Sequence, residues 1–366
     1  MTDWAGFVQL QLSRGARAAG DAQRRLVAAY GDPAEEYAAI AAGPAIIDRS
    51  YRGLLQVVGR DRAAWLHNIT TNHIKDLAVG TGRYALALNR HGRIVFDLNV
   101  LVRPDSIWID LHRCFVAAAL AHLDKFIITE DVRVVDHSDE FVRLGIAGVR
   151  GIELLGRLGI RDAGQASSLD VTEVQWSDVV VPVARHDFCG TFGAELFVPA
   201  YRAVDLWREL TEGSLQPVAV PAGDEAVQMH RVEAGVPWSG REITDEYLPA
   251  ESGLLERTVS LDKGCYPGQE VVERMRSRGA VARHLVGLLL HGHRIPPGGA
   301  EILGDDGKRV GSVTSACRSP VRDAVVGLGY CRVSSCVEGT AVRVSWGGDS
   351  VRAVVAPLPL TEPGGR

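Results

Sequence analysis

The sequence predicts an α+β protein that ends in a small antiparallel β-barrel. Segments typical of strands and of helices are mixed through the first 280 residues, without the regular strand–helix alternation of a doubly wound sheet. After Arg283 the pattern changes to short apolar runs separated by Gly, Asp and Pro turns, at 285–290, 310–314, 325–330, 341–346 and 351–355. This spacing is typical of a barrel or sandwich of about eighty residues.

Helices and strands alternate irregularly in the first part of the chain. Residues 14–30 are rich in Ala, Arg and Gln and end at Gly31-Asp32-Pro33, which predicts a helix. Three further helices are expected. The first spans 35–42, the second begins after a cap at Asp61 and ends before 70–72, and the third spans 116–126. Strands are expected at 54–58, 84–88, 94–102 and 108–111, with a hairpin turn at 89–92.

A second mixed unit follows. We expect strands at 179–184 and 195–198 around a polar bend at 187–193, then helices at 201–210 and 223–234. The change of pattern predicts a boundary near residue 280, with residues 276–279 as an exposed connection. The predicted domains are a helical extension at 1–30, a body at 31–280 and a barrel at 284–360.

Composition limits the class of protein. A chain of 366 residues predicts two or three domains, and 46% hydrophobic with 23% charged residues is ordinary for a globular protein. The net charge of −5 disfavours a nucleic-acid partner held by bulk phosphate attraction. No signal-peptide pattern and no apolar run of membrane-spanning length is visible, so we predict a cytoplasmic protein without a membrane partner. Nothing suggests a coiled coil, and a monomer is expected.

Six cysteines lie at 114, 189, 265, 317, 331 and 336. Their scatter, without a secretory signal, argues against a disulfide framework. No Cys-x-x-Cys pair is present, so the four-ligand spacing of a built-in zinc or iron–sulfur site is missing. We therefore predict no resident metal.

The segment from Lys263 to Glu270, Lys-Gly-Cys-Tyr-Pro-Gly-Gln-Glu, is the most informative part of the chain. In an extended segment Lys263 and Cys265 would share a face, and a nearby cation favours the reactive thiolate. Gly264 leaves the thiol open to approach, and Pro267-Gly268 is a turn pair that would present the loop. The alternative is that Cys265 is a small buried hydrophobic residue.

This segment carries a resemblance to a known family. The chain resembles the aminomethyltransferase-like folate-binding superfamily from about Pro44 to its end, and looks most like the YgfZ branch, which is linked to iron–sulfur protein maturation. Supporting motifs are Leu55-x-Val-x-Gly59-x-Asp61, Thr70-Thr71-Asn72, Asn89-x-x-Gly92-Arg-Ile94, Gly193-Ala-Glu195-Leu-Phe197, Arg231-Val-Glu233-Ala-Gly235-Val-Pro237 and Gly240-Arg-Glu242.

The resemblance implies a two-part α+β body that binds tetrahydrofolate, followed by the barrel. It implies that Glu195 holds the pteridine, because a carboxylate can accept two hydrogen bonds from an aminopyrimidine edge. The alternative for Glu195 is a surface glutamate on a strand. Arg231 matches an arginine that lies near the ligand in the family, which implies a ligand contact. The alternative for Arg231 is a salt bridge to Glu233 or a neighbour. Asn72 contacts the ligand or caps a turn.

The transferases of this superfamily carry an adjacent pair of acidic residues after a glycine-rich turn, one of them catalytic. This chain has Phe96 followed by Asp97, so a single acid remains. If the catalytic position falls on Asp97, its carboxylate could steer proton transfer near the folate nitrogens. If the position falls on Phe96, that role is lost. A separate alternative is that Asp97 is a strand residue facing solvent.

Three functions follow from these expectations. The first is a tetrahydrofolate-binding accessory factor for iron–sulfur client or assembly proteins, in which Cys265 supplies a thiolate, Tyr266 and Gln269 shape the loop, and Glu270 pairs with Lys263 or orients a partner. The second is an enzyme that transfers an aminomethyl carbon to tetrahydrofolate. The third is a tRNA-modification factor that uses Arg274, Arg276, Arg278 and Arg283, whose alternative is a solvated linker.

Overall fold

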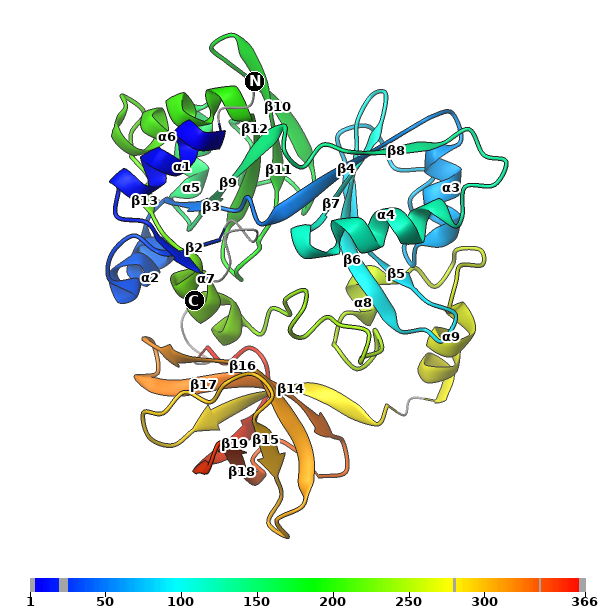
Figure 1. Ribbon diagram of the computed structural model, residues 1–366, viewed down its shortest axis with the longest axis vertical. Helices are drawn as coiled ribbons and strands as arrows, with labels where there is room; N and C mark the ends of the chain where they lie inside the picture. The colour runs from blue at the N-terminus through cyan, green and yellow to red at the C-terminus, as the bar shows by residue number, and fades with distance from the viewer. Residues whose placement is uncertain (1–3, 20–25, 279–280, 336, 362–366) are drawn as a thin grey trace. The chain divides into compact units, whose positions relative to one another are not determined.

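The computed structural model describes residues 4–19, 26–278, 281–335 and 337–361 (Figure 1). The chain divides into two compact units. Unit 1 comprises residues 1–85, 97–227 and 262–264, and unit 2 comprises residues 86–96, 228–261 and 265–366. No helix within the described ranges combines the length and the apolar character that a bilayer crossing requires.

The elements of the first part of the chain mix helices and strands as predicted. In chain order they are α1 Trp4–Ser13, β1 Arg17–Ala19, β2 Leu26–Ala29, α2 Pro33–Ala42, β3 Ala45–Asp48, β4 Arg52–Val58, α3 Arg62–Ile69, β5 Gly82–Leu88, β6 Ile94–Val102, β7 Ile107–His112, η2 Arg113–Phe115, α4 Val116–Asp124, β8 Arg133–Asp136, β9 Phe141–Ala147 and α5 Gly151–Arg157.

The remaining elements include the C-terminal strands. They are β10 Val171–Trp176, β11 Val179–Arg185, β12 Gly193–Pro199, η3 Ala200–Arg202, α6 Ala203–Glu212, β13 Val220–Pro221, α7 Asp224–Ala234, α8 Leu255–Thr258, α9 Gln269–Arg278, β14 Arg283–Leu290, β15 Glu301–Leu303, β16 Arg309–Ser319, β17 Ala324–Arg332, β18 Ala341–Trp346 and β19 Asp349–Ala356.

Two sheets form the framework of unit 1. A six-stranded sheet has the order β10-β11-β12-β9-β3-β13, and a five-stranded sheet, whose strand β5 continues into unit 2, has the order β5-β6-β7-β4-β8. Helices α1, α5 and α6 lie beside the six-stranded sheet (Figure 1). They contribute to one core in which Phe7, Leu154 and Trp207 pack with strand residues. A second core joins Leu54 and Trp108 of the five-stranded sheet to Phe197 of the other.

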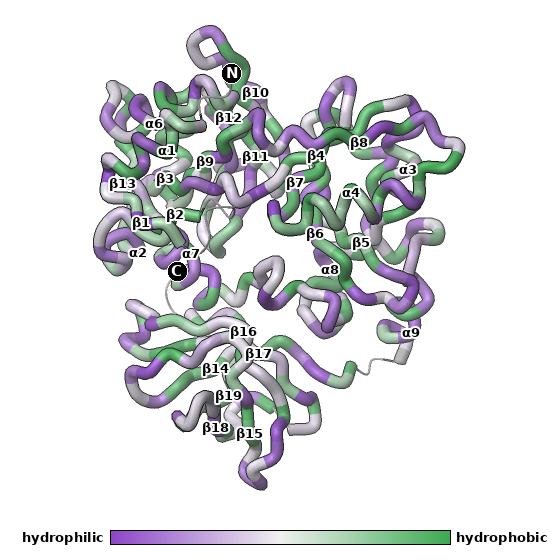
Figure 2. The backbone as a smooth tube through the Cα atoms, viewed as in Figure 1, coloured by the Kyte–Doolittle hydropathy of each residue, from purple (hydrophilic) through white to green (hydrophobic). Residues whose placement is uncertain are grey.

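The C-terminal strands close into the predicted barrel, in the order β14-β17-β16-β15-β18-β19. Buried and more exposed residues alternate along β16, as one-sided packing of a barrel strand requires. The strands of the barrel carry both hydrophobic and hydrophilic residues (Figure 2). The short strand β15 was not predicted, because three residues give no periodic signal.

Several local predictions are confirmed and two are wrong. The helix expected at 35–42 is α2, which begins after Asp32, whose side chain accepts from the Ala34 amide at 2.9 Å. The helix expected at 14–30 is wrong: β1 and β2 pair there as a two-stranded sheet, and residues 20–25 lie outside the described ranges. The connection expected at 276–279 is exposed at Arg276 and Ser277, as predicted, but its expected form is wrong, because residues up to 278 belong to α9. Residue 279 lies outside the described ranges.

A buried ionic cluster connects the two sheets of unit 1. We define it as Arg49, Arg52, Asp110, Arg143 and Glu195. Asp110 on β7 accepts two hydrogen bonds from the Arg52 guanidinium, at 3.0 and 2.6 Å. Its Oδ1 also accepts from Nη2 of Arg143 on β9 at 2.9 Å. The same nitrogen lies 2.7 Å from Oε1 of Glu195 on β12, and Arg49 Nη2 lies 3.3 Å from Oε2.

Electrostatics inside this cluster favour the charged carboxylates. Burial alone would raise the pKa of Asp110, but Arg52 and Arg143 overcome burial and lower it. Burial would also raise the pKa of Glu195. The charges of Arg143 and, to a smaller extent, Arg49 hold that pKa well below the usual range. The Arg143 and Arg49 guanidinium groups stack on Phe197 and Phe188, each 3.8 Å from the ring centroid. The cluster therefore has a structural role, which is to connect the two sheets of unit 1.

We predict that Asp110→Asn lowers the free energy of unfolding by about 3 kcal/mol or more, because two buried guanidinium groups lose their shared counter-charge. Urea denaturation measures the change. Asp105→Asn is the matched control, since Asp105 is an exposed residue between β6 and β7. Equal stability of the two variants would contradict a structural role for the cluster.

Candidate functional site

Lys263 lies at a buried position in unit 1. Its side-chain ammonium donates to the carbonyl oxygens of His67, Thr70 and Asn72, the last at 3.1 Å. These carbonyls lie at the end of α3 and in the turn that follows it, where a helix exposes unsatisfied acceptors and the negative end of its dipole. Lys263 is thus a cation that caps the carboxyl end of α3.

The electrostatics around this cap agree with the geometry. Burial lowers the pKa of Lys263 to about 8, while three accepting carbonyls favour the ammonium form. The pKa of His67 is lowered to about 4, first by its own burial and then by the neighbouring Lys263 charge. His67 Nδ1 accepts from the Ile74 amide at 3.2 Å, which requires that nitrogen to be unprotonated.

Cys265 has a different environment from Lys263. It is a free cysteine, and its side chain is exposed, whereas Lys263 is 7% exposed. The expectation that the two side chains share one surface is therefore wrong. The expectation assumed an extended segment, in which residues i and i+2 point to the same face. Residues 263–265 form no strand, so this rule does not apply to them. The alternative of a buried cysteine is also wrong.

Cys265 lines a hollow of about 400 Å³ in unit 2. The hollow brings together the thiol, the Tyr266 and Gln269 side chains and the tip of the β5–β6 hairpin. Its lining residues are Arg90, Cys265, Tyr266, Pro267, Gly268, Gln269, Glu270 and Glu273. Tyr266 is buried, and burial followed by the nearby Glu273 charge raises its pKa to about 12. Tyr266 is therefore a neutral packing residue of the loop.

Two glycines hold the hairpin tip against the Cys265 loop. Gly268 and Gly92 have φ values of +82° and +71°. A Cβ on Gly268 would lie 2.5 Å from the Asn89 carbonyl oxygen, and a Cβ on Gly92 would lie 2.8 Å from Val271 Cβ. Only glycine satisfies both the positive φ and the close approach, which explains these residues in the two motifs.

Asp97 and Asn72 lie near the same tyrosine in unit 1. Asp97 is buried on β6, so the expectation that it faces solvent is wrong. The Tyr84 hydroxyl donates to Asp97 Oδ2 at 2.9 Å, and Asn72 Nδ2 donates to the Tyr84 carbonyl at 2.9 Å. Asn72 Oδ1 accepts from the His73 amide at 2.8 Å, as expected for a turn-capping asparagine. Sequence reasoning missed Tyr84, although it lies on the strand that neighbours the strand of Asp97 in the predicted hairpin.

Glu195 and Arg231, expected near a folate, each lie in an ion pair of their own unit. Glu195 is buried in the ionic cluster, so the alternative of a surface glutamate is wrong. Arg231 is fully buried and donates to Glu242 Oε2 at 3.0 Å and to the Val236 carbonyl at 3.2 Å. Its salt-bridge partner is therefore Glu242, the neighbour that ends the last quoted motif. Both side chains therefore have strong structural roles, Glu195 within unit 1 and Arg231 within unit 2.

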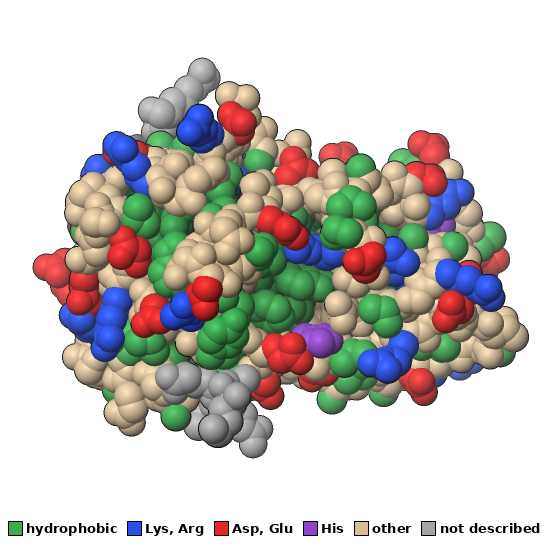
Figure 3. Space-filling view, turned by 90° about the horizontal axis from the view of Figure 1, so that it is seen from above, with side chains coloured by type: hydrophobic (Ala, Val, Ile, Leu, Met, Phe, Trp, Pro, Cys, Tyr) green, Lys and Arg blue, Asp and Glu red, His purple; other side chains and the backbone are tan. Residues whose placement is uncertain are grey.

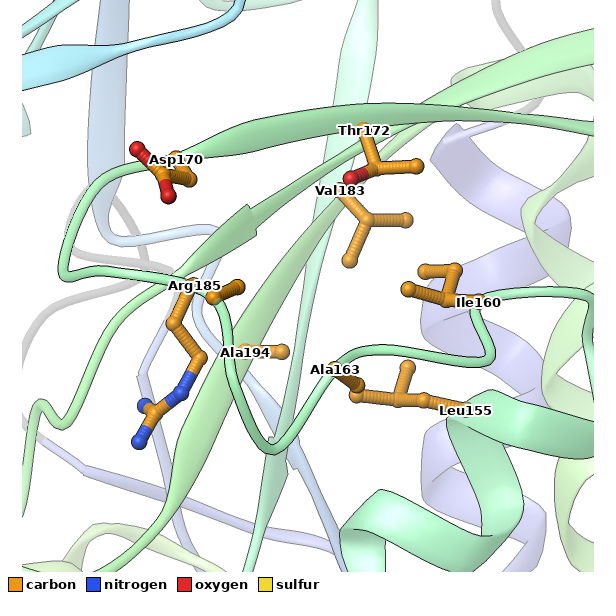
Figure 4. A pocket seen from close by; sticks show the side chains of 9 residues that line it. Leu155, Ile160, Ala163, Asp170, Thr172, Val183, Arg185 and Ala194 are labelled. Atoms are coloured by element: carbon orange, nitrogen blue, oxygen red, sulfur yellow. The ribbon is translucent and has the colours of Figure 1, made fainter.

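A small hollow in unit 1 lies between α5 and strands β10 to β12 and is lined mainly by aliphatic side chains (Figure 4). Its one cation, Arg185, points toward Asp187 and donates to it at 3.0 Å. Within the described ranges, no group of three or more His, Cys, Asp or Glu side chains is placed to hold a metal ion.

The arginines considered for RNA contact are partly neutralised. Arg276 pairs with Glu273 at 2.9 Å and Arg283 with Glu251 at 3.2 Å. The side chain of Arg278 lies outside what the structure describes. The two ion pairs reduce the positive charge that this stretch could offer to RNA. The face shown in Figure 3 carries interspersed acidic and basic side chains.

We predict that Lys263→Met lowers the free energy of unfolding by about 2–3 kcal/mol, because buried carbonyls at the end of α3 lose their donor. Thermal or urea unfolding measures it. Lys75→Met is the control, since Lys75 is an exposed lysine beyond the same helix. A stability loss no larger than that of the control would refute the capping role.

Comparisons with known proteins agree with this architecture. The profile of the GCVT N-terminal domain matches residues 11–263, and that of the glycine cleavage T-protein C-terminal barrel domain matches residues 283–361. An aminomethyltransferase of Geobacillus kaustophilus is 28% identical over 331 residues, covering 89% of each chain. A putative chloroplastic transferase of Arabidopsis thaliana is 26% identical over 319 residues, covering 87% of this chain and 71% of its own.

A solved structure shows the same fold. The crystal structure of the glycine cleavage system aminomethyltransferase T from Bartonella henselae matches with a TM-score of 0.86 at 24% identity, covering 97% of each chain. The likeness extends through both the mixed body and the barrel, in agreement with the predicted fold class. With family matches across most of its length, this chain belongs to the GCVT family, whose N-terminal domain is here followed by the T-protein C-terminal barrel.

Proposed function

We propose that the protein is a tetrahydrofolate-binding accessory factor of the YgfZ type, which serves the assembly or repair of iron–sulfur proteins through the Cys265 thiol. The observation that carries this proposal is the exposed free cysteine in the Lys-Gly-Cys-Tyr loop, on the edge of a hollow. The GCVT family membership supports the folate part. The iron–sulfur part rests on the resemblance of the loop to the YgfZ signature.

Unit 1 contains two buried carboxylates that could hold a folate, Asp97 and Glu195. The pterin ring of a folate needs a carboxylate that accepts from its aminopyrimidine edge. Asp97 offers such a group, because it is a buried carboxylate held by the Tyr84 hydroxyl at 2.9 Å. Glu195 fits less well, since both its oxygens lie against arginines. We therefore assign the pterin contact to Asp97 with Tyr84, in place of Glu195.

Within this proposal Lys263 and Cys265 have separate tasks. Lys263 holds its part of the segment by capping α3, which leaves the thiol two residues later as the group that meets a partner. Exposure allows a partner protein or small molecule to reach the sulfur, whether it acts as nucleophile, ligand or redox centre. Gln269 begins α9 beside the same hollow and shapes its wall.

Cys265→Ser is expected to abolish activity in a folate-dependent maturation assay of an iron–sulfur protein, because serine keeps the shape of the loop but lacks the thiol. Calorimetric binding of tetrahydrofolate should persist in this variant and weaken at least tenfold in Asp97→Asn. Cys114→Ser is the matched control, since the Cys114 side chain is also exposed and takes part in no disulfide. Full maturation activity without the Cys265 sulfur would discard the thiol proposal.

The second candidate function is aminomethyl transfer to tetrahydrofolate. The buried Asp97 carboxylate favours it, as do relatives that carry the name aminomethyltransferase. In that case purified protein would form methylenetetrahydrofolate from an aminomethylated carrier. Asp97→Asn would stop that reaction and Cys265→Ser would leave it intact, so the same two variants separate the two functions.

A further inference from the structure

The barrel of unit 2 carries a hollow that the proposed function does not use. It has a volume of about 480 Å³ and lies over strands β18 and β19, the hairpin between β15 and β16, and the residue after β14. These strands follow one another around the closed barrel (Figure 1). Its charged and ionisable side chains are His291, Asp305, Arg343 and Arg352.

The strand register places two arginines face to face in this hollow. Arg343 on β18 is directly opposite Arg352 on the antiparallel strand β19, so the two side chains project from the same face. Leu303 is opposite Arg343 on the other side, and the His291 amide donates to the Arg352 carbonyl at 2.9 Å. A cationic row, which we define as Arg343 and Arg352, therefore crosses neighbouring strands, and His291 lies beside it.

Nothing among the described residues neutralises this pair. Both arginine side chains are exposed, and neither takes part in an ion pair or a side-chain hydrogen bond within the described ranges. Asp306 of the nearby hairpin is paired with Lys308 at 2.9 Å, which leaves Asp305 as the one acid on the lining. Like charges directly opposite each other destabilise a sheet. An anion bound between the two arginines would therefore stabilise this arrangement.

We propose that the cationic row binds an oxyanion, the phosphate or carboxylate group of a small molecule. Two guanidinium groups present planar donor forks that match the paired oxygens of such groups. Two arginines against one aspartate leave an excess positive charge, which an anion would balance. The hollow provides room for the body of a small molecule beside the anionic group. This site is independent of folate and of Cys265.

The test uses the full-length chain with inorganic phosphate as the probe, at constant ionic strength maintained with sodium chloride. Isothermal titration calorimetry should show one saturable site in the natural protein. Arg343→Gln and Arg352→Gln should each weaken binding at least fivefold, and the double variant should abolish it. Arg318→Gln is the control, because Arg318 is an exposed arginine of the same barrel that pairs with Asp323.

Two further measurements separate the outcomes. Succinate in place of phosphate identifies the source: competition by succinate indicates a carboxylate ligand, and binding of phosphate alone indicates a phosphorylated one. In sodium chloride without phosphate, the Arg352→Gln variant should unfold at the same temperature as the natural protein or at a higher one. The reason is that the substitution removes the repulsion between the two arginines. Undiminished phosphate binding by the double variant would overturn the proposal, as would a phosphate response no larger than that to chloride.

Discussion

The contact between Arg143 and Asp110 is the constraint on which unit 1 depends. Arg143 belongs to the six-stranded sheet and Asp110 to the five-stranded sheet, so the 2.9 Å hydrogen bond joins the two. Burying these charges is tolerated because each guanidinium meets a carboxylate, and those of Arg49 and Arg143 also stack on an aromatic ring. Gly145 shows how tightly the site is packed, since a Cβ there would lie 2.6 Å from Arg49 Cδ. Removing one charge would leave the others buried and uncompensated.

This constraint changes the interpretation of the family motifs. Glu195 belongs to a motif associated with folate. Its carboxylate nevertheless pairs with Arg49 and Arg143 in the cluster that connects the two sheets. Arg231 similarly anchors α7 through Glu242 in unit 2. Asp97 remains as the buried carboxylate beside a tyrosine hydroxyl, and Cys265 as the exposed thiol. The proposed chemistry therefore depends on these two side chains, which lie outside the ion pairs formed by Glu195 and Arg231.

The sequence predicted the features that local periodicity controls. The β5–β6 hairpin, most of the barrel strands and helices α2, α4, α6 and α7 follow from alternation, caps and turn residues. It failed where partners distant in the chain decide. Residues 14–30 have good helix formers, but pairing between β1 and β2 overrides that propensity. The partners of Lys263 lie more than 190 residues away, so the spacing of Lys263 and Cys265 could not reveal them. The arginine pair of the barrel depends on strand register, which composition does not show.

The central claim is that the Cys265 thiol is open to a partner and is connected with folate binding. Alkylation of the native protein with iodoacetamide, followed by peptide mass spectrometry with and without tetrahydrofolate, tests it most directly. The account predicts rapid labelling of Cys265, protection of the buried Cys189 and Cys317, and a change in the Cys265 rate when tetrahydrofolate is bound. Protection of Cys265 equal to that of Cys189, or a rate that tetrahydrofolate leaves unchanged, would contradict it.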